Sequence, residues 1–179
     1  GVSVKVGVGP CGVSVAVGAA GTIIYSGDGT TWSAANYSDT APTSDLYAVT
    51  YSSFNVGTNT AGTWVAVGAG GTMVQSADGV NWKTVNTGTT ADLHGIASGI
   101  TTAATSTTAS VTTFAAVGAS GALLSSTDGV TWTPQTVPVA GINLNAVSYG
   151  TQFIAVGAGG NIFYSTDGAL WTSAAVTPG

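Results

Sequence analysis

Few residues of this sequence could perform acid–base or nucleophilic chemistry. The 179 residues include seven aspartates, one histidine and one cysteine, with no Glu and no Arg. Three of the aspartates, Asp39, Asp45 and Asp92, lie outside any repeated pattern. Asp45 and Asp92 each precede a leucine that begins a predicted strand, so equivalent positions would bring both carboxylates onto one face. Two such carboxylates suit a catalytic acid–base pair or a weak cation site; alternatively, each is a solvated turn residue.

The other reactive side chains lack partners. His94 has no Ser or Cys at a recognisable spacing, so catalytic triads and zinc sites are incomplete. Cys11 has no second cysteine, which leaves a small turn residue or an intermolecular disulfide. Tyr37 and Phe54 fall in predicted loops, where an aromatic ring could stack on a sugar. We therefore predict Asp45, Asp92, Tyr37 and Phe54 as possible ligand-binding residues, with no catalytic residue, metal or cofactor.

The remaining aspartates belong to a repeated pattern, Ser-x-Asp-Gly-x-x-Trp. Its copies are Ser26, Asp28, Gly29 and Trp32; Ser76, Asp78, Gly79 and Trp82; Ser126, Asp128, Gly129 and Trp132; and Ser165, Asp167, Gly168 and Trp171. The tryptophans are spaced by 50, 50 and 39 residues. The basic unit is therefore close to forty residues, and two copies carry insertions.

The fourth copy shows the unit in its simplest form. Residues 144–149 alternate as a strand, 153–156 form a second apolar strand, and a glycine-rich turn leads to a third strand at 161–165. Asp167-Gly168 predicts a two-residue type I′ hairpin before a fourth strand at 170–174. The unit is thus predicted to be a four-stranded antiparallel meander.

A four-stranded meander repeated at this period is typical of a β-propeller blade. We predict one all-β domain, residues 1–179, with blades at about 3–36, 45–86, 92–136 and 143–176. The blades could close as a four-bladed ring, which we favour, form half of an eight-bladed ring of two chains, or belong to a longer propeller. The insertions, residues 55–63 and 101–113, are uncharged and predict extended hairpins or loops on one rim.

The repeated pattern resembles the Asp-box, or bacterial neuraminidase repeat (BNR), family, in a short-turn form that lacks one residue between Asp and Gly. The resemblance covers nearly the whole chain and implies that the Ser and Asp side chains hold a turn while the Trp packs into the blade. Sialidases of such families bind the substrate carboxylate with arginines, so the absence of Arg excludes that activity. Other glycoside hydrolases with this repeat use a carboxylate pair, for which Asp45 and Asp92 are the candidates.

Charge and hydropathy exclude further classes. The net charge is −5, and Lys5 and Lys83 are the only basic residues besides His94, which is the opposite of a nucleic-acid footprint. Mean hydropathy is +0.40, yet apolar runs stop well short of the roughly 18 residues that a spanning helix needs, so no membrane insertion is predicted. The chain starts at Gly1 without a signal-like segment, which predicts a processed or excerpted chain.

Only 5% of residues are charged, whereas cytosolic domains usually carry about a quarter. This composition favours an extracellular, non-enzymatic structural, adhesion or display module at a cell surface, on a filament or on the exterior of a virion. Its expected partners are other protein subunits, copies of itself included, or glycans. A carbohydrate-binding propeller is the alternative, and a glycoside hydrolase is a third, weaker hypothesis.

Overall fold

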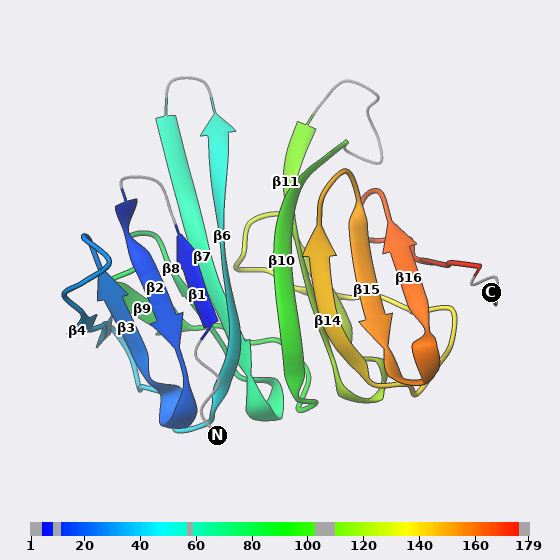
Figure 1. The fold of residues 1–179 in the computed structure, drawn as a ribbon, viewed down its shortest axis with the longest axis horizontal. Helices are drawn as coiled ribbons and strands as arrows, with labels where there is room; N and C mark the ends of the chain where they lie inside the picture. The colour runs from blue at the N-terminus through cyan, green and yellow to red at the C-terminus, as the bar shows by residue number, and fades with distance from the viewer. Residues whose placement is uncertain (1–4, 9–11, 57–58, 103–109, 176–179) are drawn as a thin grey trace.

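The computed structural model describes residues 5–8, 12–56, 59–102 and 110–175, which form four β-sheets placed side by side (Figure 1). The first sheet contains β1 (Lys5–Val8), β2 (Ser14–Val17), β3 (Ile23–Ser26) and β4 (Ser33–Ala34). The second contains β6 (Leu46–Val56), β7 (Asn59–Gly68), β8 (Met73–Ser76) and β9 (Asn81–Thr84), with β5 (Asn36–Tyr37) at its edge. The third contains β10 (Leu93–Thr102), β11 (Ser110–Gly118), β12 (Leu123–Ser126) and β13 (Thr133–Pro134). The fourth contains β14 (Leu144–Tyr149), β15 (Phe153–Gly157), β16 (Ile162–Ser165) and β17 (Thr172–Ser173). The predicted all-β fold is confirmed.

Each sheet is an antiparallel meander in chain order, apart from β5. This strand comes from the connection between the first two sheets and pairs in parallel with β9. The Asn36 N–H donates to the Val80 carbonyl at 2.8 Å, and the Ser38 N–H donates to the Trp82 carbonyl at 2.9 Å. The connection therefore covers the outer edge of the second sheet, whose backbone groups would otherwise lack partners.

The hairpin between the second and third strands of each sheet contains a glycine-rich turn, formed by the short 3₁₀ segments Ala19–Gly21, Ala69–Gly71, Ala119–Gly121 and Ala158–Gly160. In the first of these, Ala20 has φ 51° and Gly21 has φ 69°, while the Thr22 N–H donates to the Ala19 carbonyl at 3.0 Å. Two consecutive residues at positive φ with this hydrogen bond are the features of a type I′ turn.

The Asp-Gly pairs do not form the predicted two-residue type I′ hairpins. Gly29, Gly79, Gly129 and Gly168 have φ between 73° and 80°, but no aspartate among the described residues has positive φ. Six residues separate β3 from β4, so the connection is a longer loop. The prediction was wrong because it read Asp-Gly by its local preference, whereas the aspartate side chain organises a wider turn.

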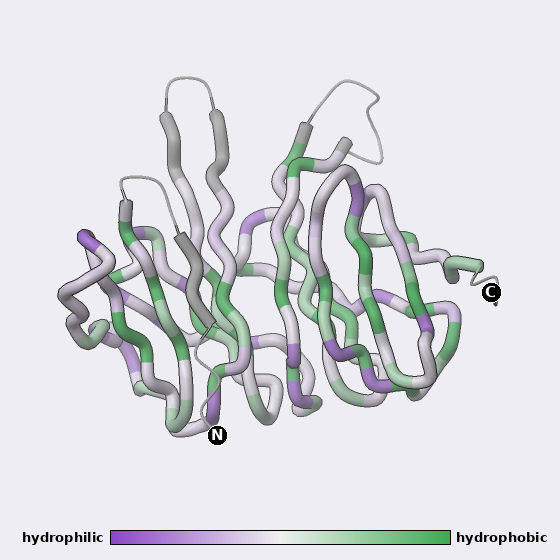
Figure 2. Tube along the Cα trace, viewed as in Figure 1, coloured by the Kyte–Doolittle hydropathy of each residue, from purple (hydrophilic) through white to green (hydrophobic). Residues whose placement is uncertain are grey.

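The core lies between adjacent sheets, where small and branched residues from one sheet meet aromatic residues of the next. Between the first and second sheets, Val15 and Val17 pack with Trp64, Ala66 and Trp82. Figure 2 shows apolar residues concentrated along the middle of the strands. The second, third and fourth sheets repeat this arrangement in two further clusters. The middle strands β7 and β11 of the second and third sheets are therefore buried on both faces, as their apolar sequences indicate.

Aromatic residues that recur at equivalent positions of the sheets pack in the core. Trp64, Phe114 and Phe153 are each at most 2% exposed. The rings of Tyr51 and Trp64 lie 5.0 Å apart, and those of Tyr149 and Phe153 lie 4.8 Å apart. Such tilted pairs add to the energy of burial itself.

The two insertions lengthen strands instead of forming separate loops. The pairing of β6 with β7 continues to Val56 and Asn59, and β10 with β11 continues to Thr102 and Ser110. Both long hairpins extend from the same end of the sheets (Figure 1). The turn residues 57–58 and 103–109 lie outside the described part of the chain.

The four sheets form an open row and do not close into the four-bladed ring that we favoured. The first strands β1, β6, β10 and β14 pack against one another in chain order. Figure 1 places the first and fourth sheets at opposite ends of this row. Closure was not predictable from the repeats, because it depends on the angle between neighbouring sheets.

Candidate functional site

The Ser-x-Asp-Gly segments form four nearly identical hydrogen-bonded turns between the third and fourth strands. In the second copy, the Ser76 hydroxyl donates to Asp78 Oδ1 at 2.9 Å and accepts the Gly79 N–H at 2.9 Å. Asp78 Oδ1 also accepts the N–H groups of Val80 and Asn81, both at 2.8 Å. The other three copies repeat these contacts at 2.7–3.0 Å. The aspartate thus closes the turn by accepting hydrogen bonds from backbone N–H groups.

These contacts keep the turn aspartates ionised. Burial raises the pKa of Asp78, but donation from Asn81 and Val80 outweighs it and holds that pKa at about 2. The Thr31 and Thr30 N–H groups lower the pKa of Asp28, and donated hydrogen bonds likewise leave the pKa values of Asp128 and Asp167 below the usual value. A carboxylate with a lowered pKa cannot serve as a general acid near neutral pH.

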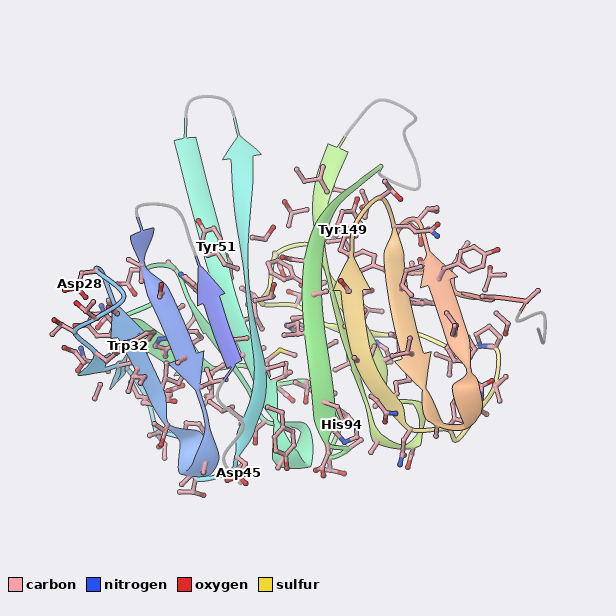
Figure 3. All side chains as sticks on the ribbon, viewed as in Figure 1. Asp28, Trp32, Asp45, Tyr51, His94 and Tyr149 are labelled. Carbon is pink, nitrogen blue, oxygen red and sulfur yellow. The ribbon has the colours of Figure 1, made fainter. Side chains whose placement is uncertain are left out.

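Each turn is joined to the core by its tryptophan, with one exception. The indole N–H groups of Trp82, Trp132 and Trp171 donate to the glycine carbonyl three residues earlier, at 3.0, 3.3 and 3.1 Å. These three rings are at most 9% exposed. Trp32 of the first sheet is only half-buried, and it stands at the free end of the row (Figure 3).

Asp45 connects the second sheet to the first by a hydrogen bond, and Asp92 connects the third sheet to the second. Asp45 Oδ1 accepts the Ala20 N–H at 2.9 Å, and Asp92 Oδ1 accepts the Gly70 N–H at 2.7 Å. Both donors are the second residues of type I′ turns in the preceding sheet. The backbone carbonyls of the same aspartates accept N–H groups of Ala69 and Ala119 within their own sheets. Each aspartate therefore bridges two sheets.

Asn143 plays the same part for the fourth sheet, and the sequence prediction missed it. Its Oδ1 accepts the Ser120 N–H at 2.9 Å. The signal was present, because Asn143-Leu144 repeats the spacing of Asp45-Leu46 and Asp92-Leu93. A search for acids alone passed over an amide that accepts the same hydrogen bond.

No family model matches this sequence, and neither does any curated protein. Among solved structures, "YCF48 bound to D1 peptide" superimposes with a TM-score of 0.57 at 15% identity, covering 94% of this chain and 50% of that one. "YCF48 from Cyanidioschyzon merolae" gives a TM-score of 0.55 at 15% identity, covering 91% of this chain and 56% of that one. YCF48 is a β-propeller.

This chain has a β-propeller fold. It spans about half the length of those two structures, and the similarity concerns architecture alone. The four sheets are called blades one to four below, and their first strands, β1, β6, β10 and β14, lie innermost and pack against one another in that order.

The innermost strands of blades two, three and four begin with a β-bulge that displays one residue each. The register shifts between Leu46 and Ala48, and again at the equivalent points of β10 and β14. The extra residues are Tyr47, His94 and Asn145. Bulges of this kind often redirect a side chain toward a functional surface.

His94 is held in one orientation by the neighbouring blade. Its Nδ1 lies 2.9 Å from the Leu144 carbonyl, and its ring lies 6.3 Å from that of Tyr47. Since a carbonyl only accepts, Nδ1 is the donor in this contact. Burial, followed by the charges of Asp92 and Asp45, raises the pKa of Tyr47. The two carboxylates therefore lie toward one end of the propeller, where Figure 3 places Asp45 and His94.

Of the two predicted sugar-stacking residues, the structure describes the side chain of Tyr37 only. Tyr37 is half-buried, its hydroxyl donates to the Gly21 carbonyl at 2.8 Å, and burial followed by the charge of Asp39 raises its pKa to about 12. It packs against the core between the first two blades, so its ring is no free stacking surface. The backbone of Phe54 pairs with Ala61 in the β6–β7 hairpin, but its side chain lies outside the described residues, as does Cys11.

A cavity of about 390 Å³ lies between the Ser-x-Asp-Gly turns of blades three and four. Most of its surface is apolar, and the hydroxyl and amide groups of its lining residues contribute to the smaller polar part, including those of Thr101, Thr113, Ser125, Thr131 and Gln135. The lining also includes Asp128 and Asp167 but contains no aromatic ring among the described residues. Among all the described residues, no group of three acidic, His or Cys side chains could hold a metal ion. None of the helices in these residues is long and apolar enough to cross a membrane.

Proposed function

We propose that this chain is a non-enzymatic β-propeller module that works on the exterior of a cell, filament or virus particle by binding other protein subunits. The observation that carries the proposal is that its carboxylates are already hydrogen-bonded to the backbone. Each of the seven aspartates accepts at least one backbone N–H, including Asp39, which accepts the Thr84 N–H at 2.8 Å. A general acid or nucleophile needs an available carboxyl group with a matched pKa.

Composition and fold support protein partners. With only 5% charged residues, the chain has little of the electrostatic repulsion that keeps monomers apart. One solved propeller of similar architecture holds a peptide of another protein. The long β6–β7 and β10–β11 hairpins, on one end of the fold, supply a surface that the other blades lack. The Asp-box resemblance fits a motif that serves the fold.

The proposal is tested with the full chain in two assays run side by side. We expect no turnover of a panel of chromogenic glycosides and measurable binding to a tiled peptide array. Hydrolysis that disappears in Asp45→Asn or Asp92→Asn would instead establish an enzyme. Labelling of intact cells or particles that carry the chain with a membrane-impermeant reagent tests its external location, and a protected chain would contradict that part.

A carbohydrate-binding propeller is the second candidate, and the cavity between blades three and four, which combines an apolar surface with several hydroxyl groups, favours it. Hydroxyl and amide groups can exchange hydrogen bonds with a sugar, although no ring is present for stacking. A glycan array with the full chain tests this candidate. Binding should fall in Gln135→Leu and persist in Thr172→Val, which changes an exposed hydroxyl outside the cavity. Signals no higher than background for every glycan would remove it.

A further inference from the structure

Among the described residues, no blade covers the outer face of the fourth blade. Phe153, Ala155 and Phe163 point toward the third blade and are fully buried in the cluster between the two. The alternate residues of β15 and β16 point to the opposite side of the sheet. They are Ile154, Val156, Ile162 and Tyr164, all only partly buried or exposed. An apolar sheet face is thus left open at the end of the row.

The other three blades show what such a face normally does. Val17, Val67 and Val117 occupy the position of Val156 on their own blades and are at most 1% exposed, because the next blade covers them. Val156 is 40% exposed. The fourth blade therefore has the apolar side chains that pack against a next blade elsewhere, but here they are partly exposed.

The first blade presents the complementary unpartnered face. Ala16 and Ile24 stand where Ala155 and Phe163 contact the preceding blade in the fourth repeat. Trp32 is half-buried, whereas the equivalent tryptophans of the other blades are covered by a neighbour. Within residues 12–175, the outer face of blade four and the inner face of blade one are therefore both without a neighbouring blade.

We propose that a second copy of this chain docks head to tail, so that blade four of each copy packs against blade one of the other in a closed ring of eight blades. The solved propellers of similar architecture are about twice as long as this chain, and a second copy supplies that length. A head-to-tail contact closes when its rotation completes a full turn in two steps. The contact continues the packing already repeated three times within the chain.

The contact between copies is expected to rest on apolar packing, without the hydrogen bond that Asp45, Asp92 and Asn143 accept from the preceding blade. The Gly159 N–H, equivalent to those bound by Asp45, Asp92 and Asn143, has no side-chain acceptor among the described residues. The sequence ahead of β1, Gly1-Val2-Ser3-Val4, offers no Asp or Asn to bind it. The interface between copies is therefore expected to be weaker than those between blades of one chain.

The mass of the full chain in solution tests the proposal, measured by sedimentation from about 1 to 100 µM, where ring association of ordinary affinity is visible. We expect twice the 17.3 kDa of one chain. Val156→Asp should weaken association at least tenfold by burying a charge in the contact. The matched control is Val130→Asp, an exposed valine in a turn of the third blade, which should leave the mass unchanged. A wild-type monomer, or a number of copies other than two, overturns the proposal.

A complementation experiment tests the head-to-tail order. Ile24→Asp blocks the inner face of blade one, and Ser14→Asp is a second variant on that face in case the first does not fold. Either variant alone and Val156→Asp alone should be monomeric, but a mixture should form a heterodimer through the one intact pair of faces. If Ile24→Asp and Ser14→Asp both remain dimeric while folded, blade four pairs with itself and the proposed order is wrong. This result would leave the proposed function untouched.

Discussion

At the residue scale, the polar side chains of this chain mainly form hydrogen bonds with its own backbone. The Ser76 hydroxyl and the Asp78 carboxylate satisfy the N–H groups of their turn, and Asp45 and Asp92 satisfy the turns of neighbouring blades. In the described residues no buried side-chain nitrogen or oxygen lacks a partner. Polar side chains in this fold therefore serve mainly to complete turns that the strands leave open.

Acid should weaken the fold through the turn aspartates. Because the pKa of Asp78 falls from 3.8 to about 2 on folding, its contribution is complete above pH 4 and is lost as the pH falls through about 2. We expect the Tm to drop steadily over this window when followed by circular dichroism. Asp78→Asn keeps an oxygen acceptor without the charge, so its Tm should lie below wild type at pH 6 and approach it near pH 2. A constant gap between the two would contradict the assignment.

Gly99 should be intolerant of any side chain. A Cβ there would lie 2.2 Å from the ring of Tyr149, which crosses from the next blade and donates to the Ile100 carbonyl. We expect Gly99→Ala to lower the free energy of unfolding by about 1–3 kcal/mol, as overpacking usually does. Urea denaturation measures it. Gly150→Ala is the control, because a Cβ at Gly150 meets nothing within 4 Å; equal effects at both sites would show that the ring moves freely.

At the scale of elements, each blade is a hairpin pair closed by two different turns. The type I′ turn joins the second and third strands, and in the first three blades it donates a backbone N–H to a side chain of the next blade. The Ser-x-Asp-Gly turn joins the third and fourth strands and is held by its own Ser and Asp side chains. The two turns face opposite ends of the propeller (Figure 3). Contacts between blades are therefore encoded in the type I′ turn and in the residue that opens the following blade.

Blades one and three carry strain in that turn. Ala20 and Ser120 have φ of 51° and 55°, where the equivalent residues of the other blades are Gly70 and Gly159. Ser120→Gly should raise the free energy of unfolding by up to about 1 kcal/mol by relieving the left-handed conformation. Gly70→Ala, the reciprocal change, should lower it by a similar amount in the same urea titration. A loss of stability in Ser120→Gly would mean that unfolded-chain entropy outweighs the strain.

At the scale of the whole molecule, stability rests on apolar contact between blades and very little on ion pairs. Only two lysines are present, and the aspartates are bound by backbone N–H groups. The interfaces repeat from blade to blade, so the fold resembles a row in which each blade depends on its neighbours. The end blades are accordingly the least supported.

Salt should therefore have little influence on stability. Raising NaCl from about 0.05 to 0.5 M shortens the range of electrostatic interactions several-fold, yet we expect the Tm to move by less than about 2 °C. Sodium sulfate at equal ionic strength should raise the Tm, because its exclusion from the surface strengthens apolar burial. Scanning calorimetry distinguishes the two salts, and a large fall in NaCl would reveal ion pairs that matter.

The sequence by itself determined the repeat, the strand order within each blade and the residues that fill it. Ser-x-Asp-Gly-x-x-Trp recurs four times because each blade needs the same turn and the same aromatic packing, and these needs are local. Only the tertiary structure decided what Asp45 and Asp92 bind, because their partners Ala20 and Gly70 lie 25 and 22 residues away in another blade. It also decided that the row stays open. Closure depends on small rotations between blades that add up along the chain, and no single residue determines the total angle.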